Sequence, residues 1–121
     1  MPGRVLLRGG AHRLELPFGE VDLVGADGAL QGGEAVTVGL RPHDIALVEG
    51  EPRPGTFRAA VHLTEPLGDI TVLDLDLNGQ GLKMVLPEER ALAVKPGQEI
   101  AVAITPAHLH LFDQATGRRL A

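Results

Sequence analysis

Apolar and polar residues alternate along most of this chain. Residues 73–77 contain three leucines separated by two aspartates, and this period of two is typical of a strand with one buried face. Residues 78–81 have the sequence Asn-Gly-Gln-Gly, which favours a tight turn, and residues 82–86 are again mostly apolar. The pattern therefore predicts a hairpin of two antiparallel strands.

Two more segments alternate in the same way. Their predicted buried faces consist of Phe57, Ala59, Val61 and Leu63 in the first segment and of Ile100, Val102 and Ile104 in the second. We expect the second of these faces to share one core with the leucines of residues 73–77. Near the N-terminus, residues 5–8 and 12–16 flank a Gly-Gly pair, which predicts another hairpin.

A helical pattern is confined to residues 88–94, which follow Pro87 and allow one or two turns. Glu88 and Glu89 stand at its start, where negative side chains suit the helix dipole. The 16 glycines and 9 prolines are spread along the chain, so turns are frequent and strands are short. This organisation predicts an all-β domain, a small barrel or a sandwich of short antiparallel strands, with at most one short helical turn.

Composition limits the functions open to the chain. Its 121 residues suffice for a domain that is stable without disulfides, and the absence of cysteine excludes thiolate metal sites and thiol redox chemistry. The formal net charge is −5, and phenylalanine, with three residues, is the only one of Phe, Tyr and Trp present. Nucleic-acid binding requires cations for the phosphates and rings for the bases, so we expect no nucleic-acid partner.

Nothing in the sequence predicts membrane insertion or export. No apolar segment approaches the roughly 20 residues of a membrane span. The first four residues, Met-Pro-Gly-Arg, do not begin the apolar core of a signal peptide. We therefore expect a soluble cytoplasmic protein.

Residues 30–34, Leu-Gln-Gly-Gly-Glu, look like the signature motif of ABC ATPases. That motif begins a helix whose first amides meet a nucleotide phosphate, whereas the Ala-Val-Thr-Val segment that follows here predicts a strand. Neither Lys83 nor Lys95 belongs to a glycine-rich loop that ends in Gly-Lys-Ser/Thr. We expect a turn at residues 30–34, and neither ATP, Mg²⁺ nor another cofactor on this chain.

The candidate metal ligands form an incomplete set. His108 and His110 alternate on a strand-like segment, and two imidazoles on one face can bind zinc. A third ligand would have to come from His12, His43 or His62, and no His-Cys or His-Glu cluster completes the set. Packing and hydrogen bonding are therefore the favoured roles of these histidines, and we expect no metal.

Acid–base chemistry also lacks suitable residues. Glu65 with Asp69, and Glu88 with Glu89, are the candidate carboxylate pairs. The first pair lies in a predicted solvated turn, and the second pair would point in different directions on a helix. The chain has no serine, which excludes a Ser-His-Asp triad. We predict no catalytic residue and no enzymatic activity for this chain.

Residues 41–44, Arg-Pro-His-Asp, separate two predicted strands. One alternative is an anion-binding turn with Arg41 as the fixed cation. The other is a structural turn that Pro42 sets and that Arg41 and Asp44 pair or cap. We favour the structural turn, because most polar groups in turns bond to the nearby backbone.

Three segments together resemble one protein family. Residues 38–45 (VGLRPHDI) match a Gly-Ile-Arg-Pro-Glu-His/Asp-Ile pattern, and residues 61–73 (VHLTEPLGDITVL) match Val-x-x-x-Glu-x-Leu-Gly-x-x-x-x-Leu. Residues 95–120 match a closing pattern of Gly-Asp/Gln-x-Val, Pro-x-x-x-His-Leu-Phe-Asp and Thr-Gly-x-x-Leu. Their order and spacing resemble the C-terminal regulatory domain, TOBE or oligonucleotide-binding-like (OB-like), of ATP-binding subunits of maltose- and glycerol-phosphate-type ABC importers. The resemblance is good for residues 36–121 and looser for residues 1–35, the opening hairpin region.

This resemblance implies a single OB-like domain over residues 1–121, a fragment without the N-terminal ATPase domain of its parent. The parent would be a transport ATPase for sugars or related solutes, and its ATPase domain would bind ATP and Mg²⁺. The fragment would serve regulation and dimerisation. Implied partners are a second copy of the subunit, the membrane permease subunits, and a regulatory protein or small effector. The implied location is cytoplasmic, peripheral to the inner membrane.

The resemblance also implies a set of joints in the fold and the subunit interface: Arg41, Pro42, His43, Asp44, Glu65, Gly68, Asp69, His110, Phe112 and Asp113. Two positions depart from the family pattern. Leu40 replaces the usual isoleucine, which changes little. His43 replaces the usual glutamate, so a contact that needs a carboxylate there loses its partner.

A small-ligand binding module is the second alternative, since related barrels bind oxyanions such as molybdate between subunits. Oxyanion sites use backbone amides together with Ser, Thr or basic side chains. This chain has no serine, and its 11 basic residues are scattered along the sequence. We therefore rank oxyanion or effector binding below the importer role.

Overall fold

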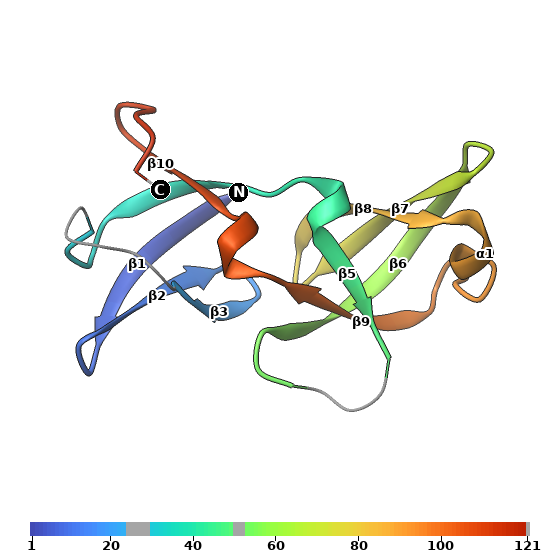
Figure 1. Cartoon of the computed structure of the whole chain (residues 1–121), viewed down its shortest axis with the longest axis horizontal. Coiled ribbons are helices and arrows are strands. Elements are labelled where there is room, and N and C mark those ends of the chain that lie inside the picture. The colour runs from blue at the N-terminus through green and yellow to red at the C-terminus, as the bar shows by residue number, and fades with distance from the viewer. Residues whose placement is uncertain (24–29, 50–52, 121) are drawn as a thin grey trace.

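The structure is a computed structural model of the chain and describes residues 1–23, 30–49 and 53–120. Its strands form two curled five-stranded sheets, which lie side by side along the long axis as two lobes (Figure 1). The strand order is β10-β4-β1-β2-β3 in the first lobe and β5-β9-β6-β7-β8 in the second lobe. Every strand pair is antiparallel, so the all-β prediction of short antiparallel strands is confirmed.

The chain crosses twice between the lobes. The first lobe contains β1 (Pro2–Arg8), β2 (Ala11–Leu16), β3 (Gly19–Asp22), β4 (Ala35–Gly39) and β10 (His110–Asp113). The second lobe contains β5 (Ile45–Val48), β6 (Thr56–Pro66), β7 (Ile70–Leu77), β8 (Gln80–Pro87), α1 (Glu88–Ala91) and β9 (Glu99–Ile104). Two 3-10 helices form the crossings, η1 (Pro42–Asp44) and η2 (Pro106–His108). A late strand, β10, therefore completes the first lobe.

Both predicted hairpins are present. β1 and β2 are joined by Gly9 and Gly10, whose φ angles are 58° and 81°, and β7 and β8 are joined by Asn78 and Gly79, whose φ angles are 53° and 91°. Two consecutive positive φ angles are typical of the tight turn whose twist matches antiparallel strands. Glycine and asparagine adopt this backbone conformation with little strain, so the turn residues alone predict these two hairpins.

The helix is shorter than its pattern predicts. α1 ends at Ala91, and the following residues form a turn in which the Val94 N–H donates to the Ala91 carbonyl over 3.0 Å. Pro96 follows, and the residue before a proline avoids the helical conformation. The side chain of Val94 is buried, so packing and not helix formation accounts for the apolar residue at this position.

The apolar faces pack into two clusters, one in each lobe. The three leucines of residues 73–77 share the second-lobe cluster with Ile100 and Val102, as predicted. The prediction for Ile104 is wrong, because β9 runs toward the first lobe and its last side chain joins that lobe's cluster. The prediction for Leu63 is also wrong. A register shift between Val61 and Leu63 interrupts the alternation of β6 and leaves the Leu63 side chain 62% exposed.

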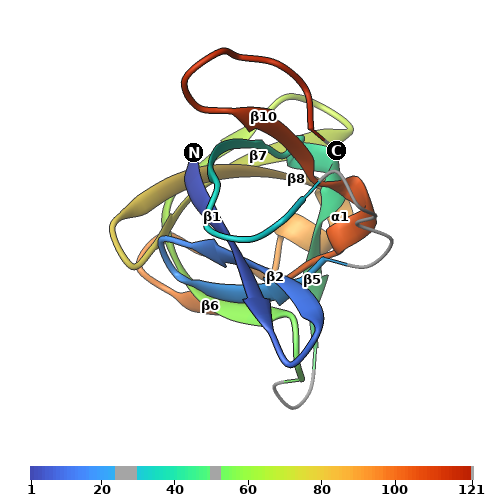
Figure 2. The ribbon, with the colours of Figure 1, turned by 90° about the vertical axis from the view of Figure 1, so that its left-hand side faces the viewer.

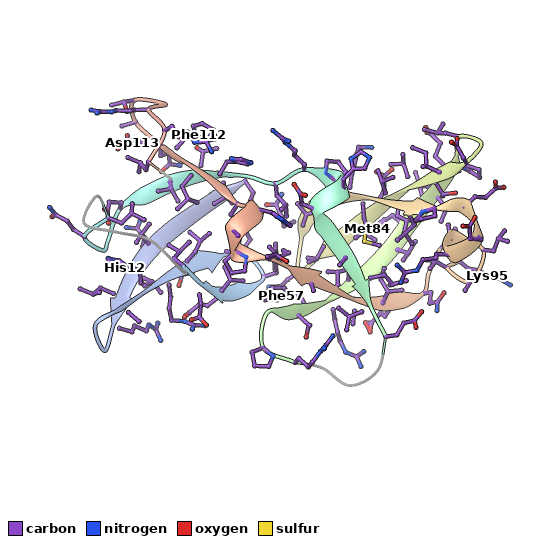
Figure 3. The ribbon with its side chains drawn as sticks, viewed as in Figure 1. His12, Phe57, Met84, Lys95, Phe112 and Asp113 are labelled. Atoms are coloured by element: carbon purple, nitrogen blue, oxygen red, sulfur yellow. The ribbon has the colours of Figure 1, made fainter. Side chains whose placement is uncertain are left out.

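Aromatic packing joins the two lobes. The Phe18 and Phe57 rings meet edge to face, with centroids 4.9 Å apart, and both side chains pack against the clusters of both lobes. Figure 3 shows Phe57 at the junction between the lobes. A Cβ atom at Gly19 would lie only 2.7 Å from Cε1 of Phe57. The absence of a side chain at Gly19 therefore permits the close approach of the ring.

Replacement of Gly19 tests this junction. Gly19→Ala places a methyl group against the Phe57 ring and imposes an L-residue on a φ of 149°, so we expect the free energy of unfolding to fall by about 2 kcal/mol or more. Urea denaturation measures the change. Gly81→Ala is the matched control, because a Cβ there meets no atom within 4 Å, and it is expected to change stability by less than about 0.5 kcal/mol. Equal effects of the two substitutions would contradict the packing argument.

Candidate functional site

The predicted site residues lie in three groups along one side of the molecule. These groups are η1, the turn between β6 and β7, and β10, and they lie on the upper side in two perpendicular views (Figures 1 and 2). β10 and the β6–β7 turn are at opposite ends of the long axis, with η1 between them (Figure 1). None of the ten residues belongs to the buried part of either core cluster. The structure thus brings the groups to one side but not into one pocket.

η1 forms the first crossing between the lobes and contacts η2, which forms the second. The Asp44 N–H donates to the Arg41 carbonyl over 2.9 Å, and Pro42 occupies the start of the helical turn, as expected for a structural turn. The Asp44 carboxylate lies 3.7 Å from Nδ1 of His108, which belongs to η2. It therefore faces the other crossing and not Arg41, whose side chain is exposed. The contact between η1 and η2 is a feature that sequence reasoning did not find.

The β6–β7 turn is exposed and tied to α1. Gly68 has a φ of 111°, and the Leu67 N–H donates to the Ile70 carbonyl over 2.8 Å. The Asp69 carbonyl accepts the N–H of Glu88 over 3.0 Å. Glu65 and Asp69 are both exposed, as predicted for a solvated turn.

Asp113 closes the turn that follows β10. Its Oδ1 accepts the N–H groups of Ala115 and Thr116, each over 2.9 Å, and its own N–H donates to the Arg118 carbonyl over 2.7 Å. The N–H donors of Thr116 and Ala115 hold the pKa of Asp113 below its ordinary value, because they stabilise the ionised carboxylate. Asp113 is thus a structural anion at the base of the turn.

The outer face of β10 carries an aromatic ring and a hydrogen-bonded cation. Phe112 packs against neither core cluster, and its Cε2 lies 3.6 Å from the position that a Cβ of Gly39 would occupy. Nη2 of Arg119 lies 2.7 Å from Nδ1 of His110, so the guanidinium donates to the imidazole. Arg119 is also absent from the set of residues that sequence reasoning singled out. The only sequence indication was a pair of consecutive arginines after Thr-Gly.

The segment with the ATPase-like signature forms a turn, as expected. The Glu34 carboxylate accepts the N–H of Gln31 over 2.8 Å and the N–H of Gly32 over 2.6 Å. These bonds, led by that from Gln31, hold the pKa of Glu34 below its ordinary value. No helix follows, because β4 begins at Ala35. Consequently residues 30–34 do not present helix amides to a phosphate.

The histidines do not gather into a metal site. Within residues 1–23, 30–49 and 53–120, no three His, Asp or Glu side chains converge on a common point. His108 faces Asp44 and His110 binds Arg119, so the two imidazoles use different partners.

Within residues 1–23, 30–49 and 53–120, no helix is both long enough and apolar enough to cross a membrane.

A cavity of about 630 Å³ lies in the first lobe, with polar walls that include Arg4, Glu15 and Glu20. Two of its three charged side chains, those of Glu20 and Arg4, have polar partners. Glu20 forms ion pairs with Arg8 over 3.2 Å and with Arg13 over 3.0 Å, and Arg4 donates to the Gly33 carbonyl over 2.8 Å. Arg4 and Glu15 form no ion pair within the described residues, so the cavity presents one charge of each sign and no excess charge that would define a ligand.

Comparison with known proteins identifies the family to which these motifs belong. A profile of the TOBE domain matches residues 38–112, which contain η1, the β6–β7 turn and most of β10. The chain is 38% identical over 89 residues to sn-glycerol-3-phosphate import ATP-binding protein UgpC 2 of Agrobacterium fabrum, covering 73% of this chain and 22% of that protein. It is 34% identical over 110 residues to UgpC of Ruegeria sp., covering 88% of this chain and 30% of that protein. The chain therefore spans between about a fifth and a third of these relatives.

A further relative and a solved structure agree with this assignment. The sulfoquinovosyl glycerol transport ATP-binding protein SmoE of Agrobacterium fabrum is 31% identical over 88 residues, covering 73% of this chain and 24% of that protein. The crystal structure of the cytoplasmic molybdate-binding protein ModG superposes with a TM-score of 0.71 at 20% sequence identity, covering 91% of this chain and 92% of that chain. The shared architecture confirms the OB-like fold.

The hydrogen bonds of Asp113 predict a pH-dependent effect. An aspartate whose pKa is lowered by folding stabilises the protein above its unfolded-state pKa, about 3.9, and this contribution disappears as the pH falls through the folded-state pKa. Asp113→Asn is therefore expected to lower the melting temperature at pH 7 and to have no effect near pH 2. Calorimetry at several pH values measures both. Asp69→Asn, whose carboxylate accepts no hydrogen bond from the described residues, is the control. A difference that persists unchanged at pH 2 would contradict the prediction.

Proposed function

The chain belongs to the TOBE domain family, and we propose that it is the regulatory and dimerisation domain of the ATP-binding subunit of an ABC importer for sugars or related solutes. Two of the relatives described above are named as sn-glycerol-3-phosphate import ATP-binding proteins and one as a sulfoquinovosyl glycerol transport ATP-binding protein. A phosphorylated or glycosylated glycerol is thus the kind of solute that the relatives favour. The chain spans a minor part of these proteins, which supports the view that a separate ATPase domain belongs to the same subunit.

One observation carries this proposal. The ten joint residues implied by the family resemblance lie along one side of the molecule, and none of them is a buried member of either core cluster. Motif residues that do not build the core are free to contact another molecule. The partners in this proposal are a second copy of the subunit, the permease subunits of the transporter, and a regulatory protein or small effector. The location in this proposal is cytoplasmic, peripheral to the inner membrane.

The chain itself has no enzymatic role in this proposal. ATP and Mg²⁺ bind the ATPase domain of the intact subunit, and this domain supplies contacts. The turn at residues 30–34 supports this separation of ATP binding from the present domain. This segment looks like an ATPase signature, but its Glu34 carboxylate accepts hydrogen bonds from the backbone of the same segment. Outside the present 121 residues, the intact protein is expected to contain a glycine-rich loop that ends in Gly-Lys-Ser/Thr. A full-length sequence without that loop would contradict the importer assignment.

Oxyanion binding is the second candidate function. It is favoured by the fold shared with ModG, whose structure contains bound molybdate. At 20% sequence identity, this similarity shows a shared architecture alone. The absence of serine from the chain also removes one common ligand of anions. Titration with molybdate, followed by calorimetry, tests it. Saturable binding of molybdate would favour oxyanion binding over the importer role.

Subunit pairing by this domain is testable in solution. Sedimentation across protein concentrations from about 1 µM to about 1 mM is expected to show a monomer–dimer equilibrium, because the domain supplies only part of the contact between intact subunits. Arg41→Glu and Asp69→Lys reverse charges in two of the surface groups and are expected to weaken the dimer by about tenfold or more.

Arg58→Glu is the matched control. Arg58 lies on β6 outside the three groups and is 78% exposed, and among the residues that the structure describes it pairs only with Glu99, over 2.9 Å at the surface. Such a pair contributes little to stability, so this charge reversal is expected to leave the dimer unchanged. A monomer at every concentration would contradict pairing through this domain.

A further inference from the structure

The outer face of β6, β7 and β8 carries apolar side chains that no part of the core covers. When one face of an antiparallel sheet packs on the core, the other face is usually polar. On these three strands and the turn after β6, five apolar residues lie outside both core clusters of the described chain, two of them more than half exposed. We call this set the outer patch, and it consists of Leu63, Leu67, Ile70, Val72 and Val85.

The strand register makes the outer patch continuous. Val72 at its centre is opposite Val85 of β8, and Ile70 lies two positions earlier on the same face of β7. Leu63 of β6 is opposite Asp74, so it is the diagonal neighbour of Val72. Opposite side chains on one face have Cβ atoms about 5 Å apart and diagonal ones about 7–8 Å apart, so these residues are neighbours.

A bulge in β6 creates the exposed end of the outer patch. Val61 is buried opposite Leu75, and the register then shifts so that Leu63 is opposite Asp74. His62 is the extra residue, and after it the alternation of β6 is reversed. The Leu63 side chain is consequently 62% exposed, and a partner that covers it would remove apolar area from water.

A hollow of about 300 Å³ lies beside the outer patch, toward the β7–β8 turn. Its walls include Asp74, Asp76 and Lys83. Asp76 is opposite Gly81, and a Cβ at Gly81 would meet no atom within 4 Å. The missing side chain on β8 thus leaves space next to the Asp76 carboxylate.

Negative charge exceeds positive charge on this face. Nζ of Lys83 donates to the Asp74 carboxylate over 2.8 Å, so these two charges neutralise each other. Glu65, which is opposite the central valine of the patch, and Asp76 form no ion pair within the described residues. Two uncompensated carboxylates attract a cationic surface and repel a second copy of this face, which brings the same charges.

We propose that the outer patch and the hollow form a docking surface for a cationic amphipathic helix of another protein. Apolar side chains of the helix cover the outer patch, and one lysine or arginine enters the hollow and pairs with Asp76. The patch extends over about five strand positions, about 17 Å, and a helix of about 12 residues has a length of about 18 Å. The inference rests on this face alone, so it holds or fails independently of the proposed importer role.

Calorimetric titration of the chain with two synthetic helical peptides tests the surface. Both peptides have about 12 residues and leucines on one face, and the other face carries lysines in one peptide and glutamates in the other. The lysine peptide is expected to bind at one saturable site, with an affinity that falls as the salt concentration rises, and the glutamate peptide at least about tenfold more weakly. Equal affinities, or no saturable binding of the lysine peptide up to about 1 mM, would overturn the inference.

Leu63→Ser and Asp76→Asn test the two parts of the surface separately. Each is expected to weaken the lysine peptide by about fivefold or more, because the first removes apolar contact area and the second removes the paired charge. Leu63 is outside the core, and asparagine keeps an oxygen at position 76. Both variants are therefore expected to keep the melting temperature of the parent chain.

Leu7→Ser and Glu15→Gln are the matched controls in the first lobe. Leu7 on β1 is 54% exposed, and Glu15 on β2 is exposed and forms no ion pair within the described residues. Their loss is expected to change the affinity for the lysine peptide by less than about twofold, because neither lies on the proposed surface. If the controls weaken the peptide as much as Leu63→Ser and Asp76→Asn do, the site is wrong.

Sedimentation of Leu63→Ser distinguishes a second copy of the chain as the occupant. The variant is expected to show the same association state as the parent chain, because like charges disfavour pairing through this face. Loss of a dimer in this variant would identify a second copy as the occupant and overturn the assignment of a cationic partner. A monomeric parent chain would contradict subunit pairing alone, and the peptide titration still decides the present inference.

Discussion

The contact on which the rest of the structure depends is the packing of Phe57 against the first lobe. Phe57 belongs to β6 of the second lobe, and its ring meets the edge of Phe18 and lies over Gly19. Two of the three aromatic residues of the chain are used in this one contact. An aromatic pair removes a large apolar area from water and has a preferred geometry, so it fixes orientation as well as proximity. The alignment of η1, the β6–β7 turn and β10 along one side follows from this fixed relation between the lobes.

Local sequence patterns predict those parts of the fold that depend on neighbouring residues. The hairpins at Gly9-Gly10 and Asn78-Gly79 follow from residues that tolerate positive φ, and the strict alternation of β7 follows from its buried and exposed faces. The pairing of β10 with β4 joins residues about 70 positions apart, and no local pattern specifies such a partner. The predicted burial of Leu63 is wrong because a register shift interrupts β6. The predicted place of Ile104 in the second-lobe core is wrong because β9 ends at the junction of the lobes.

The candidate site likewise has some features that the sequence predicts and others that only the structure shows. The spacing of the motifs predicted the ten residues of the three surface groups and the family, because a motif is defined by residue types and their order along the chain. The Asp44–His108 contact and the hydrogen bond between Arg119 and His110 are properties of neighbours in space. A sequence contains charged residues but does not show which of them are paired. These features therefore required the three-dimensional structure.

The double crossing of the chain also determines when each lobe can be finished during synthesis. The strands of the second lobe lie in one continuous segment, Ile45 to Ile104, so this lobe can close as soon as that segment has left the ribosome. The first lobe begins earlier, but the edge of β4 that pairs with β10 stays unpaired until the last strand emerges. An unpaired strand edge is a template for association with other chains. Of the two lobes, the one that is translated first is consequently completed last, and its unpaired β4 edge is exposed to misassembly for longer.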